Sequence, residues 1–422
     1  MIKKLILPVI ALILMTCLSP VFGRSFSTAL ATSAPVAETT VPTAGSAEGQ
    51  NQPGTAAGLD SKNIGEQMTG LDLNTVDKYL SEINRNLNGS MPQINLKDMV
   101  TKLARGELGF GAGEVVKGLL KYLFREMVAN SRLMGQLLIL AVLCTVLQNV
   151  QTAFEKGAVS KVAWFVCYLV LLTLALGSFT MALQTGRETI ENMVAFMHAM
   201  LPVLITLLTA MGNITTATLF HPLTLVVLST ISTLIKNMVF PLIFLSAILG
   251  LANNLTDRVE VSRLAGLLKD LSMGLLGLFF TIFLGFMMVQ GIAGGVADGV
   301  AMRTAKFGIG VFVPVVGKLF SDALEAIVGT SLLLKNAVGL AGILGIFFIC
   351  AFPILKIVAL MLIYKIAAAV IQPIGDKLIA DSLNIMGNSL TMVFVAVTSV
   401  GIMFFFVIAI VVGAGNFSLM LR

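Results

Sequence analysis

Long apolar runs are the feature that most constrains what this chain can fold into. A helix that crosses a hydrocarbon core of about 30 Å needs about 20 predominantly apolar residues. Of the 422 residues, 57% are hydrophobic and 12% are charged, whereas a soluble domain carries roughly 25% charged residues. The sequence therefore predicts an all-α, polytopic membrane protein.

The run from about residue 219 to residue 252 is longer than one crossing needs, and Lys236 and Pro241 stand near its middle. A proline inside a helix removes a hydrogen bond and favours a break, so we expect two short crossings there. Eight separate crossings are predicted in all: 133–153, 161–183, 195–212, 219–235, 237–252, 271–293, 338–364 and 391–414.

The N-terminus has the pattern of an export signal. Lys3 and Lys4 precede an apolar stretch and a proline, which is the order of a secretory signal peptide. Residues 1–31 are predicted to be this signal, with cleavage after Gly23 or after Ala31. An uncleaved signal anchor is the alternative, and both readings put the following segment outside the cytoplasm.

The exported segment is predicted to have two parts. Residues 32–66 contain almost no large apolar side chains, so we expect a disordered linker. Residues 67–132 show short amphipathic helical patterns, and the last helix carries Lys117, Lys121 and Arg125 at a spacing of four. This last helix is predicted either to lie on the membrane surface or to begin a small soluble bundle.

Basic residues give a test of orientation. With the N-terminal segment outside, the basic loops 154–160, 253–270 and 365–390 are predicted to be cytoplasmic, in agreement with the positive-inside rule. A second group of basic residues would then lie outside, against that rule: Arg303, Lys306, Lys318 and Lys335.

The region 294–336 is too short of apolar residues to give two clear crossings. It contains "FGIGVFVPVVGKLF", which includes Pro314, and then a helix start at Ser321 and Asp322. We expect a re-entrant hairpin near 307–334, because irregular backbone at membrane depth survives only where protein or water covers it.

An internal repeat is also predicted. Pro202 and Pro314 are separated by 112 positions, and so are Pro241 and Pro353. Duplicated halves with interrupted helices are a known way to build a membrane pathway. The predicted organisation after the exported segment is the first two crossings in 133–182, repeat one in 183–295 and repeat two in 296–422.

Polar residues and prolines in the apolar runs are the candidate site residues, because charges at membrane depth usually face a cavity or a partner. Lys236 is interpreted as extending toward an interface, whereas Lys356 fits that role and a functional role equally well. The candidates for helix breaks or for lining a pathway are Pro202, Lys236, Pro241, Pro314, Asp322, Lys335, Pro353 and Lys356.

The sequence does not predict an enzyme. It has no G-x-x-x-x-G-K-[ST] nucleotide loop, no nucleophile–base pair and no nucleic-acid-binding motif. Its two histidines and four cysteines show no metal-ligand spacing, so no metal or cofactor is expected.

Two stretches resemble a known family. The run "FVPVVGKLFSDALEAIVGTSLLLKNAVG" (312–339) and the ending "GAGN" (413–416) are similar to the stage III sporulation protein AE family of endospore-forming bacteria. The resemblance extends over about 65–416, and 312–339 is its most specific part.

The resemblance implies a role that the residues alone do not give. Members of this family are integral to the mother-cell membrane around the forespore. They assemble with other stage III sporulation A proteins and, through them, with the forespore stage II sporulation protein Q, in a specialised secretion or feeding-tube channel. Another member of the set supplies the ATPase. Membrane lipid and further copies of this chain are the remaining expected partners.

A stand-alone secondary transporter, with a substrate path at the repeat interface, is the alternative function. A transporter should carry several acidic or polar residues at the middle of its crossings. Few such residues are found here, which favours a scaffold or conduit subunit.

Overall fold

The computed structural model of the chain describes residue 81 and the ranges 112–153, 158–254, 261–312, 317–374 and 377–420. Backbone contacts divide the chain into two units, Met1–Ser61 and Lys62–Arg422, and the described residues belong to the second. The predicted signal peptide, the linker, Pro314 and most of the exported helical segment lie outside the described residues.

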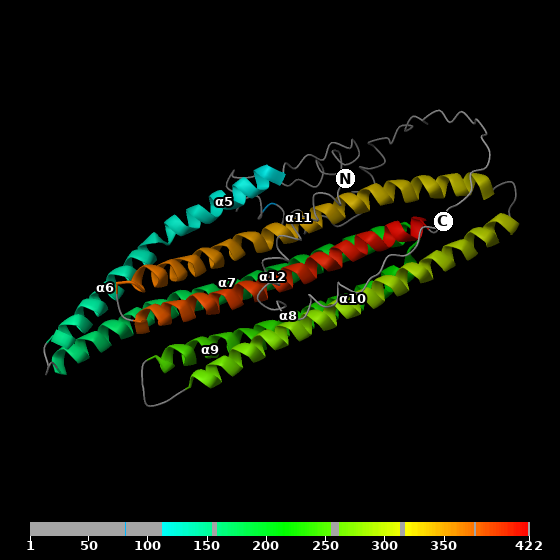
Figure 1. Cartoon of the computed structure of the whole chain (residues 1–422). Coiled ribbons are helices and arrows are strands. Elements are labelled where there is room, and N and C mark those ends of the chain that lie inside the picture. The colour runs from blue at the N-terminus through cyan, green and yellow to red at the C-terminus, as the bar shows by residue number, and fades with distance from the viewer. Residues whose placement is uncertain are drawn as a thin grey trace, which may run out of the picture. The chain divides into compact units, whose positions relative to one another are not determined.

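Where it is described, the second unit consists of helices. They are α5 (Ala112–Ala129), α6 (Ser131–Ala153), α7 (Ala158–Ala210), α8 (Ile214–Leu234), the π-helix η1 (Ile235–Val239), α9 (Phe240–Asn253), α10 (Ser262–Phe312), α11 (Gly317–Ile371) and α12 (Lys377–Met420). Figure 1 shows α7, α10, α11 and α12 running side by side. The prediction of an all-α chain is confirmed for this part of the sequence.

Six helical stretches in the described residues are long and apolar enough to cross a membrane: 131–149, 162–210, 222–253, 262–291, 334–371 and 377–413. The prediction of a polytopic membrane protein agrees with this finding. The predicted count of eight separate crossings is corrected, because two pairs of predicted crossings each form one continuous helix.

The first such pair is 161–183 and 195–212, which α7 joins without a break. The intervening residues 184–194 are polar but include Gln, Arg and Glu, which are good helix formers. They interrupt the apolar pattern without interrupting the helix. Pro202 is also inside α7 and lies on its exposed side, so it is not a helix break.

The second pair is 219–235 and 237–252, which are joined through η1. The backbone N–H of Phe240 donates to the carbonyl oxygen of Ile235, so the helix widens by one residue just before Pro241. Pro241 then occupies the first turn of α9, where its missing N–H has little consequence. The predicted break is therefore a π-bulge, a feature often found at functional sites.

The region 294–336 forms the end of α10 and the start of α11. These are ends of long helices of 51 and 55 residues, not a separate pair of short helices. Pro353 likewise lies inside α11. The position of this region relative to a membrane stays a prediction.

The predicted duplication begins at residue 183 and changes units at residue 295. Both positions fall inside continuous helices, α7 and α10, so neither coincides with the boundary of an element. The duplication stays a prediction.

The central helix of the unit is α12, which contacts α7, α8, α9, α10 and α11. Within its most apolar window 61% of the residues are buried, against 22–39% for the other five stretches. From Leu390 to Gly413 its sequence has no charged side chain and is largely apolar, and such a helix belongs in the interior. Val397, Val400 and Phe404 are fully buried on it.

Glycines on α11 allow it to approach its neighbours closely. A Cβ added at Gly345 would lie 2.6 Å from the ring of Phe196 in α7, and one added at Gly342 would lie 2.6 Å from Met200. Helices in apolar surroundings pack closely through small residues of this kind. The spacing of these glycines therefore fixes how α11 lies against α7.

The α7–α8 connection is set by Gly212, whose φ is 83°. The N–H of Asn213 donates to the carbonyl oxygen of Leu208, and the N–H of Gly212 donates to that of Thr209. This pair of bonds is a Schellman motif, which satisfies the last carbonyls of a helix and favours glycine in the left-handed position.

Buried hydroxyl groups connect the helices near the end of the unit at which α7 and α12 begin. The hydroxyl groups of Tyr168 and Ser382 lie 2.6 Å apart, and the side-chain amide of Asn254 donates to Ser382 at 3.1 Å. Tyr364 of α11 hydrogen-bonds to Ser178 of α7. In an apolar environment these bonds satisfy groups that would otherwise be costly to bury.

Candidate functional site

An ion pair joins the π-helix to α7. The Nζ atom of Lys236 lies 2.9 Å from the Oε1 atom of Glu191, and the two side chains are 20% and 59% exposed. Lys236 belongs to η1, so the bulge that accommodates Pro241 also sets the direction of this lysine. One turn of the chain therefore holds both the irregular backbone and the charge.

Glu191 is part of a polar face of α7. The side-chain amide of Gln184 donates to Glu188 at 2.8 Å, and Arg187 and Asn192 are exposed beside them. Residues 184, 188 and 191 are spaced by four and three, which places them on one face of a helix. This face lies midway along a 53-residue helix.

Lys356 of α11 lies at the same height along the helix axes as this polar face of α7. Two contacts give the register of α11 against α7: Tyr364 opposite Ser178 and Gly345 opposite Phe196. Lys356 is eight residues from Tyr364, and the α7 residue nine positions after Ser178 is Arg187. At about 1.5 Å per residue, the two charged residues are at matching heights.

Helix α5 brings a further charge to this level. The rings of Tyr122 and Phe352 lie 4.8 Å apart, centroid to centroid, and α5 runs beside α11 in the same direction (Figure 1). Arg125 is three residues beyond Tyr122, as Lys356 is four residues beyond Phe352. We call the whole set the charged belt: Arg125, Arg187, Glu188, Glu191, Lys236 and Lys356.

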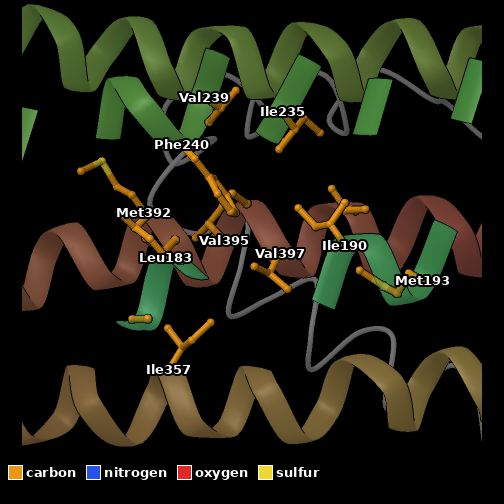
Figure 2. Close-up of a cluster of buried hydrophobic side chains, with 14 of the residues drawn as sticks. Leu183, Ile190, Met193, Ile235, Val239, Phe240, Ile357, Met392, Val395 and Val397 are labelled. Atoms are coloured by element: carbon orange, nitrogen blue, oxygen red, sulfur yellow. The ribbon is translucent and has the colours of Figure 1, made fainter. Parts of the chain in front are cut away.

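The interior beneath the charged belt is apolar. Figure 2 shows the side chains of Ile190, Ile235, Val239, Phe240 and Val397 converging from α7, η1, α9 and α12. Each of them is 0% exposed. Apolar packing therefore fills the unit at this level, and the charges lie on its outer side.

Tyr122 has a distinct electrostatic environment at the belt. The guanidinium of Arg125 lies 4.8 Å from the centre of its ring, in the range of a cation–π interaction. Burial, and then the carboxylate of Glu126, raise the pKa of the Tyr122 phenol. The last helix predicted in 67–132, which carries Lys117, Lys121 and Arg125, corresponds to α5, and it packs on α11.

A second lysine, Lys335, is fully buried in α11 at 0% exposure. Its Nζ atom donates to the backbone carbonyl oxygen of Val412 in α12 at 2.9 Å. A buried ammonium group is costly unless polar atoms surround it. The carbonyl of Val412 supplies one such partner, so this contact fixes the two helices against each other.

Gly339, one turn after Lys335, also faces Val412. A Cβ added there would lie 2.2 Å from Cγ2 of Val412. Lys335 and Gly339, near the end of the run 312–339, therefore both face Val412, which immediately precedes the ending 413–416.

The remaining predicted site residues are not brought together. Pro202 and Pro241 are exposed on α7 and α9, and Pro353 is half-buried in α11. Asp322 lies in the first turns of α11, and Pro314 lies outside the described residues. No group of three His, Cys, Asp or Glu side chains is placed to hold a metal in the part of the chain described.

Sequence reasoning missed Glu191, the partner of Lys236. Residues 184–194 fall between the predicted crossings 161–183 and 195–212, and the prediction assigns them no helix face. The spacing of Gln184, Glu188 and Glu191 was the available signal, because it is helical and continues the period of the apolar segments on both sides.

Comparison with known proteins decides the family. Residues 94–415 match the family described as stage III sporulation protein AE. The chain is also 39% identical, over 368 residues, to the protein named stage III sporulation protein AE of Bacillus subtilis (strain 168), and the match covers 87% of this chain and 89% of that protein. The chain belongs to the stage III sporulation protein AE family.

The family assignment covers the helices described here. The matched residues include all of α5 to α11 and most of α12, so both the charged belt and the Lys335–Val412 contact lie within the family region. No solved structure matches the chain.

Proposed function

We propose that the chain is a membrane subunit of the channel between mother cell and forespore during endospore formation. The observation that carries this proposal is the family match across residues 94–415, together with six helices of membrane-crossing length and composition. The membrane in question is the mother-cell membrane around the forespore. The other stage III sporulation A proteins and the forespore stage II sporulation protein Q are the proposed partners.

Within that assembly the chain acts as a scaffold that borders a conduit. Its interior at the charged belt is filled by apolar side chains such as Phe240 and Val397, which are 0% exposed. A passage for polar solutes needs polar walls and water. The passage is therefore proposed to lie between this subunit and its partners, and not through the middle of its own helices.

This packing also argues against the stand-alone transporter. Such proteins bind substrate near the bilayer midplane, at discontinuous helices that expose backbone groups to a cavity. Here the helix interruption at η1 is closed by the bond from Phe240 to Ile235, and its charge is paired with Glu191 on the outer side.

Removal of the chain from the sporulating cell that encodes it tests the proposal. We expect late forespore gene expression to fail, the forespore to lose its integrity, and the partner proteins to lose their co-purification with one another. A copy of the wild-type chain should restore all three. Normal spore formation without the chain, or an intact partner complex without it, would contradict the role.

A further inference from the structure

The long helices cannot lie wholly within one bilayer. Helix α7 has 53 residues and is about 80 Å long at 1.5 Å per residue. A hydrocarbon core is about 30 Å thick. Helix tilts reach about 40°, so even a strongly tilted α7 extends at least about 60 Å along the bilayer normal. About half of its length must therefore lie outside the hydrocarbon.

The charged belt divides α7 at a length that fits a bilayer. We call the membrane section the part between the belt and the end at which α7, α10 and α12 begin, and the outer section the part beyond the belt. In α7 the membrane section has an uncharged stretch at residues 162–183. Its length of about 33 Å matches one hydrocarbon core.

The surface of α7 changes at the belt. In the membrane section its exposed side chains include Phe165, Val166 and Val170, which are 41%, 53% and 45% exposed. In the outer section its exposed positions include His198, Thr206 and Thr209. An apolar surface of this kind is suited to lipid, whereas the outer surface of the same helix is suited to water or protein.

Other helices show the same apolar surface in the membrane section. Helix α6 exposes Ile139, Val142 and Leu143, and the start of α10 exposes Leu264 and Leu267. The outer section also exposes apolar side chains on α8 and α10, namely Ile214, Leu223, Val226, Leu278, Ile282, Met288 and Val289. Among the side chains that the structure describes, more of the exposed apolar ones therefore lie in the section that ends at the belt.

We infer that one lipid bilayer surrounds the membrane section alone, that the charged belt lies among its headgroups, and that the outer section projects from the membrane. A bilayer centred on the belt would put Arg187, Glu188 and Glu191 at the midplane, which is costly. A bilayer around the outer section would leave the apolar surface of α6 and α7 in water.

The basic residues give the direction of projection. Arg263 is the second residue of α10 and Lys377 the first residue of α12, and the positive-inside rule makes that end cytoplasmic. Lys365 lies further along, beside Tyr364 and opposite Ser178, so its flexible side chain must extend toward the headgroups if this section lies in lipid. The outer section then lies outside the cytoplasm, beside α5. Arg303 and Lys306 of α10 then belong to the projecting part, outside the cytoplasm, where the sequence also predicted them.

The inference rests on the chain's being an integral membrane protein. Only the identity of the space into which the outer section projects, between the mother-cell and forespore membranes, rests on the proposed function. A measurement on the purified full chain in lipid nanodiscs therefore tests only where the bilayer lies along the helices. Failure of the sporulation role in cells would leave its result unchanged.

Two matched threonines provide the test. Thr173 in the membrane section and Thr206 in the outer section are both exposed on α7, and each donates to the carbonyl oxygen four residues earlier, at 2.8 Å and 2.9 Å. Thr173→Cys and Thr206→Cys would each be made in a chain whose native cysteines are replaced by alanine. Thr180→Cys and Thr209→Cys form a second pair, in case one variant fails to fold.

Each cysteine would carry a fluorophore in nanodiscs whose lipids have brominated acyl chains, and a water-soluble quencher would be added in a parallel sample. We expect the bromines to quench the label at residue 173 but not at residue 206, and the soluble quencher to do the reverse. Lipid quenching at residue 206, or water access at residue 173, would overturn the inference.

Discussion

Lys236 and Lys335 lie in similarly apolar stretches of sequence but reach different environments. Lys236 leaves the helix surface at the π-bulge and pairs with Glu191, which is 59% exposed. Lys335 is 0% exposed and donates to a backbone carbonyl of α12. The two lysines should therefore respond differently to substitution.

The Lys236–Glu191 pair should contribute little to stability. Partly exposed ion pairs stabilise proteins by about 0–1 kcal/mol, so Lys236→Met should change the free energy of unfolding by no more than about 1 kcal/mol. Denaturant unfolding of the purified chain in detergent would measure this. A much larger loss of unfolding free energy would contradict the exposed position of the pair.

Replacement of Lys335 by an acid should be severe. Lys335→Glu would place a carboxylate against the carbonyl oxygen of Val412, leaving two acceptors together without a donor. We expect the free energy of unfolding to fall by about 3 kcal/mol or more. Lys377→Glu is the control, because Lys377 is an exposed lysine at the start of α12. Equal effects of the two variants would contradict the buried contact.

At the scale of elements, apolar periodicity predicted the helices but not their continuity. The predicted crossing 133–153 agrees with α6, and 391–414 lies inside α12. The sequence could not show that 184–194 stays helical, because polarity and helical backbone are separate properties. It also could not show that the chain passes Pro241 by widening into a π-turn, which depends on hydrogen bonds between neighbouring turns.

The close approach of α11 to α7 gives an element-scale prediction. Gly345→Ala would force the ring of Phe196 to move, because the added Cβ would lie 2.6 Å from it. We expect a loss of about 1–3 kcal/mol in unfolding free energy, as for other overpacked sites.

The control for this variant is Gly277→Ala in α10, where a Cβ would meet no atom within 4 Å. Alanine should there stabilise the helix by about 0.5–1 kcal/mol. Thermal unfolding of both variants would compare them, and a destabilised Gly277→Ala with an unchanged Gly345→Ala would refute the packing described here.

The turn between α7 and α8 is a second element-scale test. Gly212 has a φ of 83°, a conformation that costs an ordinary L-residue roughly 1–2 kcal/mol. Gly212→Ala should lower the unfolding free energy by about that amount, whereas Gly285→Ala, in open space on α10, should not. Hydrogen exchange at the amide of Asn213 would report whether the Schellman bond weakens, and an unaltered exchange rate would count against the motif.

At the scale of the whole molecule, the sequence predicted the class and the family but only part of the candidate site. Lys236, Lys335 and Lys356 were predicted from their apolar surroundings, and each has a defined position in the structure. Glu191 and Arg187 were missed because a belt is assembled from residues far apart in sequence. Its existence depends on helix register, which packing determines and composition does not.

The central claim is that a single bilayer ends at the charged belt. Cryo-electron microscopy of the full chain in lipid nanodiscs would test it most directly, because the density of the disc shows the lipid relative to the helices. We predict a disc about 30 Å thick in its hydrocarbon layer, with Glu191 and Lys236 at one edge and α8 projecting beyond it. A disc centred on Glu191 and Lys236 would contradict the account.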